Sequence, residues 1–498
     1  MNSQKLYNDY KAAMQKIADL RFSISLLNWD QECYMPKSGA GFRAQQIGTL
    51  SAIAHEMFVD SKLGDILSQL NTSGDLDENQ KRNVQESWKD FSREKKYPTE
   101  FVERMALTTS QTYQAWLSAR EKNDFSVYAS MLDTMIKMKR EEADILGYEN
   151  HPYNALLDLY EPDCKVMDLD VLFEDVKKNL VDYVKNISNQ KQVETGFLKQ
   201  NFPYQKQWDF GIDILKQMGY DFDAGRQDIS PHPFTTNFSM KDVRVTTRVN
   251  ENDFSSMTWS CIHEGGHALY EQGLKEENYG LPLGEAVSLG IHESQSRLWE
   301  NLIGRSFNFW NANYSALKKY FPNQLEKVSA LDFYKSINAV KPSFIRVEAD
   351  ELTYHFHIMI RYDIEKQLMD KSIEVKNLAE YWNDSYKKYL GLSVPSDNSG
   401  VLQDIHWSHG SIGYFPTYSL GSFYSVQFFN QAKKEINSLD EKVSKGELHE
   451  LREWLRGKIH QHGRKYSAKE LCMRITGEPL NFKHFMNYVK QKYDGIYF

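Results

Sequence analysis

WSCIHEGGHALY, at residues 259–270, is the stretch that most strongly predicts the fold of this chain. Its apolar residues and its histidines recur at the three- and four-residue spacing of an α-helix. The residues that share one helix face are Trp259, Ile262, His263, Gly266, His267 and Tyr270. We therefore predict a buried helix whose two histidines point toward the interior of the protein.

The two histidines and the glutamate between them have the spacing of a metal site. His263 and His267 are four residues apart, so their side chains project from one helix face, one turn apart. Two imidazoles so placed can bind one ion at the nitrogen–zinc distance of roughly 2.0–2.1 Å. Glu264 lies about 100° round the helix, where its carboxylate can take a proton from a water molecule on the metal. We predict two metal ligands and a general base.

A core helix with two hydrogen-bonded histidines is the structural alternative. The adjacent residues Gly265 and Gly266 argue against it, because each glycine inside a helix costs about 1 kcal/mol relative to alanine. A helix with only a structural role has no reason to contain such a pair, whereas a site that needs close backbone approach does.

A catalytic zinc site needs a third protein ligand and one open position. The downstream candidates are Glu271, Glu276, Glu277, Glu285 and Glu293. Glu271 lies one turn beyond His267 and too far along the axis, and the next two acids lie in a charged turn. Glu293 begins a new helix after Gly290, and the 26 residues that separate it from His267 suffice for a loop and a returning helix. We predict Glu293 as the third ligand, with Glu285 as the runner-up; no third histidine follows at HExxHxxGxxH spacing.

The rest of the chain contains only 13 prolines and 27 glycines among 498 residues, which is few for a β-rich protein. Helical spacing of apolar residues runs from Met167 to Gln192 and from Phe344 to Met369. In the second segment one apolar stripe contains Ile345, Ala349, Leu352, Phe356, Met359 and Leu368. Residues 242–249 alternate as in a strand, and residues 280–290 and 396–421 are irregular. We predict a mainly α fold with a very small β-sheet.

The composition excludes several classes of protein. The net charge is -8 and the hydrophobic fraction is 41%, without the basic surface of a nucleic-acid-binding protein. The cysteines are far apart, so we expect reduced thiols: Cys33, Cys164, Cys261 and Cys472. The N-terminus has no apolar signal segment, and no apolar run approaches the roughly 18 residues of a membrane span. We expect a cytoplasmic protein with neither a nucleic-acid nor a membrane partner.

A series of short segments besides His263–His267 occurs in the order typical of one family. They are Trp29–Glu32, Met35-Pro36, Arg43-Ala44, His232–Phe234, Asp242–Thr246, His292–Gln295, Ile345–Asp350, Gly400–Trp407 and Thr476–Leu480. Together they resemble the carboxypeptidase Taq family of HExxH metallocarboxypeptidases, and the resemblance extends from about residue 5 to residue 498.

This resemblance implies a gluzincin-like metallopeptidase with an almost entirely α-helical fold and a deep active-site groove. Residues 1–498 would form a single peptidase domain. The helices of about residues 1–165 would form one wall of the groove, and residues 166–498 would carry the metal site. The resemblance also implies a homodimer, one zinc ion per subunit with cobalt as an alternative, and Glu293 as the third ligand. The implied activity is removal of single residues from peptide C-termini, with broad specificity.

A carboxypeptidase has to recognise the terminal carboxylate of its substrate, and arginine can bind both oxygens of a carboxylate. We predict that Arg346 does so. On the predicted helix it shares a polar stripe with Asp350, Thr353 and His357, so an ordinary Arg346–Asp350 ion pair is the structural alternative. Arg244 is the second candidate, on a predicted edge strand to which a peptide can add by main-chain hydrogen bonds.

The tetrahedral intermediate of peptide hydrolysis also needs hydrogen-bond donors for its oxyanion. The glycine-containing segment at residues 406–418 offers His409, Tyr414 and Tyr418, which we predict as catalytic residues; aromatic packing is the alternative for the two tyrosines. His232 is a predicted substrate-binding residue, and His292 is expected beside the site.

Two other functions fit the same metal helix. One is an endo-oligopeptidase, and the other is a non-catalytic helical scaffold that binds zinc for stability. Glu264 argues against the scaffold, because a structural zinc needs four ligands and no base. A C-terminally amidated peptide separates the two peptidases: a carboxypeptidase should lose nearly all activity on it, and an endo-oligopeptidase little.

Overall fold

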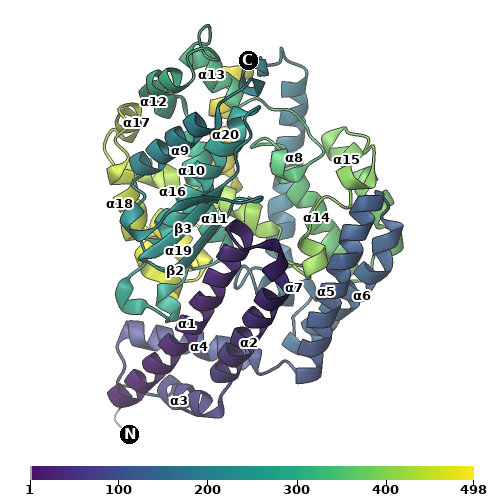
Figure 1. Cartoon of the computed structure of the whole chain (residues 1–498), viewed down its shortest axis with the longest axis vertical. Coiled ribbons are helices and arrows are strands. Elements are labelled where there is room, and N and C mark those ends of the chain that lie inside the picture. The colour runs from purple at the N-terminus through teal and green to yellow at the C-terminus, as the bar shows by residue number, and fades with distance from the viewer. Residues whose placement is uncertain (1–2) are drawn as a thin grey trace. The chain divides into compact units, whose positions relative to one another are not determined.

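The computed structural model describes residues 3–498 and confirms the predicted mainly α fold (Figure 1). Helices follow one another along the chain, and the described residues contain one three-stranded sheet. The four cysteines are free, as expected. In the described part of the chain no helix is long and apolar enough to cross a membrane.

The chain divides into two compact units. Unit one contains the residues up to Lys95, Glu194–Ile337 and Tyr424–Leu480, and unit two contains Lys96–Val193, Asn338–Phe423 and Asn481–Phe498. The chain thus passes between the units at positions other than residue 165. The single peptidase domain, with a groove wall formed by about residues 1–165, stays a prediction.

Unit one holds the predicted metal helix. Its helices are α1 (Ser3–Cys33), α2 (Ala40–Phe58), α3 (Ser61–Asn71), α4 (Glu78–Glu94), α9 (Tyr204–Met218), α10 (Phe254–Glu271), α11 (Leu289–Arg297), α12 (Phe307–Tyr320), α13 (Ala330–Ile337), α17 (Leu439–Ser444), α18 (His449–Lys458) and α19 (Ala468–Thr476). A π-helical segment, η6 (Leu298–Gly304), continues α11. Helix α16 (Pro416–Glu435) begins in unit two and ends in unit one.

Unit two consists of helices and the loops between them. The helices are α5 (Thr99–Lys122), α6 (Ser126–Leu146), α7 (Tyr153–Leu157), α8 (Val166–Ser188), α14 (Tyr354–Met369), α15 (Leu378–Leu390) and α20 (Phe482–Tyr497). The predicted helix at residues 167–192 corresponds to α8, which ends four residues earlier than expected.

The sheet lies in unit one, beside the metal helix. Its strands are β1 (Gln227–Ile229), β2 (Thr235–Ser239) and β3 (Asp242–Thr247), in the order β1-β3-β2. Strand β3 pairs parallel with β1 and antiparallel with β2. The predicted strand at residues 242–249 is therefore confirmed over most of its length, but its edge position is wrong. Alternation shows that one face of a strand is buried and carries no information about how many neighbours the strand has.

The predicted helix at residues 344–369 is wrong in its first ten residues. Helix α14 begins at Tyr354, and a short 3-10 turn, η7 (Arg346–Glu348), precedes it. Asp350 explains the difference, because its carboxylate accepts hydrogen bonds from the backbone N–H groups of Leu352 (2.9 Å) and Thr353 (3.0 Å). An aspartate that binds nearby N–H groups in this way favours a turn or a helix start over a helix interior. Arg346 and Asp350 therefore do not share a helix face, and the predicted polar stripe that contained both is wrong.

An aromatic cluster in unit one supports the first turn of α10. Phe254 packs against the rings of Phe202, Phe210, Phe321 and Phe333, with ring centroids 5.0–6.4 Å apart across the cluster. All five side chains are almost completely buried. This cluster packs against the helix that carries both histidines, so the predicted metal helix is anchored in a tightly packed core.

Candidate metal centre

The two glycines of α10 allow its neighbours to approach closely. A Cβ atom at Gly266 would lie 2.7 Å from Ser296 Cα and 2.8 Å from the carbonyl oxygen of Gln295, which are backbone atoms of α11. A Cβ atom at Gly265 would instead meet the side-chain ends of Leu215 and Met218 on α9. The predicted close backbone approach is therefore present, and its partner is the helix that carries Glu293.

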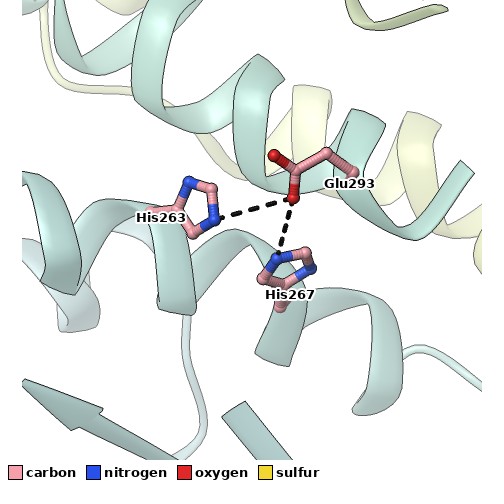
Figure 2. A group of neighbouring side chains, drawn as sticks. All are labelled: His263, His267 and Glu293. Atoms are coloured by element: carbon pink, nitrogen blue, oxygen red, sulfur yellow. Dashed lines mark ion pairs between the residues drawn. The ribbon is translucent and has the colours of Figure 1, made fainter. Parts of the chain in front are cut away.

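Three side chains converge across the contact between α10 and α11. Figure 2 shows His263 and His267 pointing from one helix toward Glu293 on the facing helix. Glu293 Oε2 lies 3.7 Å from His263 Nε2 and 3.3 Å from His267 Nε2. Two donors that each bind one ion at about 2.0–2.1 Å in a tetrahedral arrangement lie about 3.3 Å apart, so this donor set fits a zinc ion. The ion would be held by the two imidazole nitrogens and one carboxylate oxygen.

The remaining carboxylate oxygen of Glu293 is held by the chain itself. Arg297 Nε donates to this oxygen, Oε1, at 2.7 Å, while Ser296 Oγ donates to the backbone carbonyl of Glu293 at 2.8 Å and lies 3.1 Å from Oε2. Burial alone would raise the pKa of Glu293, but Arg297 and the two histidines hold it well below its usual range. The lowered pKa favours the ionised carboxylate, which is the form that binds metal ions.

Glu300, on the π-helical segment η6, orients the first histidine. Its Oε2 atom lies 2.9 Å from Nδ1 of His263, which leaves Nε2 facing Glu293. Burial would raise the pKa of Glu300, but Arg297, His263 and Arg305 keep it low. Carboxylates commonly orient metal-binding histidines in this way. The sequence prediction missed Glu300; the only local signal was its position two helical turns after Glu293.

The second histidine is covered by His292, which was expected beside the site. The rings of His267 and His292 stack with centroids 4.4 Å apart and planes 14° apart. His292 Nε2 lies 2.8 Å from Glu271 Oε1, and Asn237 donates to the other carboxylate oxygen of Glu271 at 2.6 Å. Glu271 is therefore not among the three converging donors and binds the histidine that packs on His267.

Glu264 is not one of the three converging donors. Its side chain is buried, and Thr235 Oγ1 on β2 donates to its Oε2 atom at 2.7 Å. Burial raises the pKa of Glu264, and this effect outweighs the neighbouring His263 and the hydrogen bond from Thr235, which lower it. A raised pKa makes a carboxylate a stronger base.

The other acidic candidates lie elsewhere. Glu285 pairs with Arg464 at 3.1 Å, in a cluster that also contains Asp90 and Glu86. Glu276 and Glu277 are exposed. Among the described residues, the group that could hold a metal ion is His263, His267 and Glu293, so the geometry favours Glu293 over its runner-up.

In unit two, Arg346 is buried and binds Asp404 rather than Asp350. Arg346 Nε donates to Asp404 Oδ1 at 3.0 Å, and Arg361 Nε donates to Asp404 Oδ2 at 2.6 Å. Arg346 also contacts the Tyr354 hydroxyl at 3.3 Å, and its guanidinium lies 5.1 Å from the ring centre of Tyr418. Two guanidinium groups thus share one carboxylate, which leaves an excess of positive charge.

The predicted oxyanion donors lie in the same unit, on and after the 3-10 turn η10 (His406–His409). The Tyr418 hydroxyl lies 3.4 Å from His406 Nε2, and the rings of Tyr414 and Tyr418 are 5.3 Å apart. His409 is exposed and packs on Tyr113, with ring centres 5.2 Å apart. The structure therefore groups the two tyrosines around His406, a residue that the sequence prediction did not select.

The remaining predicted substrate residues are in unit one. Arg244 forms hydrogen bonds of 2.9 and 2.8 Å with Asp242, and its guanidinium lies 4.3 Å from the ring centre of Trp29 and 4.8 Å from that of Phe238. Each of these contacts fixes the arginine on the central strand β3. His232 is exposed in the connection between β1 and β2.

Known proteins are similar to this chain over nearly its whole length. The family model described as carboxypeptidase Taq (M32) metallopeptidase matches residues 9–493. Carboxypeptidase 1 of Bacillus subtilis (strain 168) is 38% identical over 486 residues, which are 97% of each chain. The crystal structure of the M32 carboxypeptidase from Deinococcus radiodurans R1 is 35% identical, with a TM-score of 0.97 over 99% of each chain. A solved structure of CHT is 56% identical, with a TM-score of 0.97 over 98% of this chain and 99% of that one.

Proposed function

Because the chain belongs to the carboxypeptidase Taq (M32) family of metallopeptidases, we propose that it removes single residues from peptide C-termini at the site of His263, His267 and Glu293. The observation that carries this proposal is the convergence of two imidazole nitrogens and one carboxylate oxygen next to a buried glutamate outside the ligand set. A structural zinc site would have four protein ligands and would need no base.

Zinc is the metal that we propose, one ion per subunit, because two histidines and a carboxylate are a ligand set typical of catalytic zinc; cobalt is the alternative. When bound, the ion lowers the pKa of the attacking water and polarises the carbonyl of the peptide bond. Glu264 accepts the proton of that water and delivers it to the departing amine, a contribution of roughly 10²–10⁴-fold to the rate.

Arg346 is the group that we propose for the terminal carboxylate of the substrate. Arg346 and Arg361 together carry two positive charges against the single charge of Asp404, so an arriving carboxylate would complete the neutralisation of this cluster. Arg244, by contrast, already has one carboxylate of its own, that of Asp242. Charge balance therefore favours Arg346 over Arg244.

Tyr418 and Tyr414 are our candidates for oxyanion donors, with His409 and His232 as further candidates for contacts with the substrate. The Tyr418 hydroxyl lies 3.4 Å from His406 Nε2, and the guanidinium of Arg346 lies 5.1 Å from its ring centre, so Tyr418 has two polar neighbours. Broad specificity, the homodimer and the cytoplasmic location are proposed from the family resemblance.

A peptide pool analysed by mass spectrometry tests the proposed function. The metal-loaded protein should shorten peptides one residue at a time from their C-termini, and the chelator-treated protein should leave them intact. C-terminally amidated copies of the same peptides should also stay intact. Internal fragments together with cleavage of the amidated copies would establish an endo-oligopeptidase, and an intact pool with a stabilising metal would establish the scaffold.

A further inference from the structure

Strand β2 presents two polar side chains to helix α10. Thr235 and Asn237 are two residues apart, so they lie on the same face of the strand. Thr235 contacts Glu264, and Asn237 contacts Glu271, which lies on the same helix seven residues, or about two turns, further on. The face of β2 therefore runs along the face of α10 that carries the proposed base.

We propose that Thr235 is a positioning residue for Glu264, an inference that rests on the proposed role of Glu264 as general base. The hydroxyl of Thr235 donates to Oε2 of the carboxylate and thereby holds the side chain through one of its two oxygens. A base has to stay within hydrogen-bond reach of the proton that it removes, and a fixed rotamer keeps it there.

The same hydroxyl also lies 3.0 Å from the backbone carbonyl oxygen of Glu264. A hydroxyl has one proton, so it can donate to only one of the two oxygens at a time. The carboxylate oxygen is nearer, at 2.7 Å, and it carries the charge. Hydrogen bonds to charged acceptors are the stronger ones, so the hydroxyl donates to the carboxylate, and the contact does more than join the strand to the helix.

A rigid frame holds Thr235 in place, and it is built from two of the segments that the sequence singled out. Phe234 and Thr246 exchange two hydrogen bonds of 2.9 Å, one from the Phe234 N–H to Thr246 Oγ1 and one from the Thr246 N–H to the Phe234 carbonyl. Ser230 Oγ lies 2.7 Å from Thr246 Oγ1 and donates to the carbonyl of His232 at 2.6 Å. Thr246 is completely buried. The segments 232–234 and 242–246 thus fix the residue that directly follows the first of them.

Replacing the hydroxyl by a methyl group tests this inference, because Thr235→Val keeps the shape of the side chain. We expect kcat to fall by about 10- to 100-fold, with KM and the metal content unchanged. Thr235→Ser keeps the hydroxyl and should retain most of the turnover. Thr236→Val is the matched control, since Thr236 is on the same strand but on its opposite face, and its activity should equal that of the unmodified protein.

Full turnover in Thr235→Val, or equal losses in the valine and serine variants, would overturn the inference. A fall in melting temperature or metal content that accounts for the lost activity would show a purely structural tie. If Thr235→Val does not fold, Thr235→Ala removes the hydroxyl without adding a clash and answers the same question. Glu264→Gln separates the two levels of the proposal. An active Glu264→Gln refutes the base itself, whereas an inactive Glu264→Gln beside a fully active Thr235→Val refutes only the role of Thr235.

Discussion

Gly266 sets the distance between the histidine helix and the helix of the third ligand, and Gly266→Ala should therefore weaken metal binding. The added Cβ atom would lie 2.7 Å from Ser296 Cα, whereas ordinary contacts begin at 3.4 Å. The two helices have to separate by the difference, about 0.7 Å, because backbone atoms cannot rotate away as a side chain can. Glu293 lies on α11 only one turn before Ser296 and moves with it.

A shift of this size matters because metal–ligand distances tolerate only about 0.2 Å. Disturbing a group that holds a ligand in place typically costs 10–100-fold in metal affinity, and we expect a loss in this range or above it. Helix propensity acts in the opposite direction, since replacing glycine by alanine inside a helix contributes about 1 kcal/mol of stability. A loss of metal therefore cannot come from a weaker helix.

Gly265→Ala is the matched control on the adjacent residue. Its Cβ atom would approach Leu215 Cδ2 at 2.7 Å and Met218 Cε at 2.9 Å, which are the ends of flexible side chains that can move aside. The metal affinities of both variants are measured by competition with a chelator, and their melting curves confirm folding. Equal affinities of the two variants, or a normal affinity in Gly266→Ala, would refute the reasoning.

Three further substitutions test the assigned roles. Glu264→Gln should keep the metal and lose roughly 10²–10⁴-fold in turnover, as measured by metal analysis and peptide assay; full activity with metal bound would rule out the base. Glu293→Ala should lose metal during dialysis and Glu285→Ala should keep it, and the reverse result would transfer the ligand role. Arg346→Ala should lose roughly 10–150-fold in kcat/KM on ordinary peptides and little on an amidated peptide, with the metal content unchanged. Equal losses on both peptides would make Arg346 a structural partner of Asp404.

The convergence of His263, His267 and Glu293 could be predicted because its information is local. The four-residue spacing of His263 and His267 requires only that the segment be helical, and the restart of a helix after Gly290 indicated where a returning carboxylate would lie. Helix α10 and the convergence of Glu293 with both histidines agree with these predictions. The alternation at residues 242–249 likewise identified strand β3.

The partners of these residues could not be predicted, because they come from distant parts of the chain. The hydroxyl that binds Glu264 belongs to a strand 29 residues earlier, and the carboxylate at His263 lies 37 residues later. No periodic pattern links such positions. Strand β3 was wrongly predicted to lie at the edge of the sheet for the same reason. Its second neighbour is strand β1, which is only three residues long and has no distinct alternation of its own.

The error at Arg346 has a different cause, and correcting it strengthens the case for this residue. Apolar spacing alone extended helix α14 backward through Asp350, although an aspartate that binds the N–H groups of the following residues marks the start of a helix. On a continuous helix Arg346 would have had Asp350 as its own carboxylate. Because Arg346 precedes helix α14, it shares Asp404 with Arg361, which is itself completely buried. Burying two guanidinium groups beside one shared carboxylate is costly, and we propose that the terminal carboxylate of a peptide substrate supplies a further anion there.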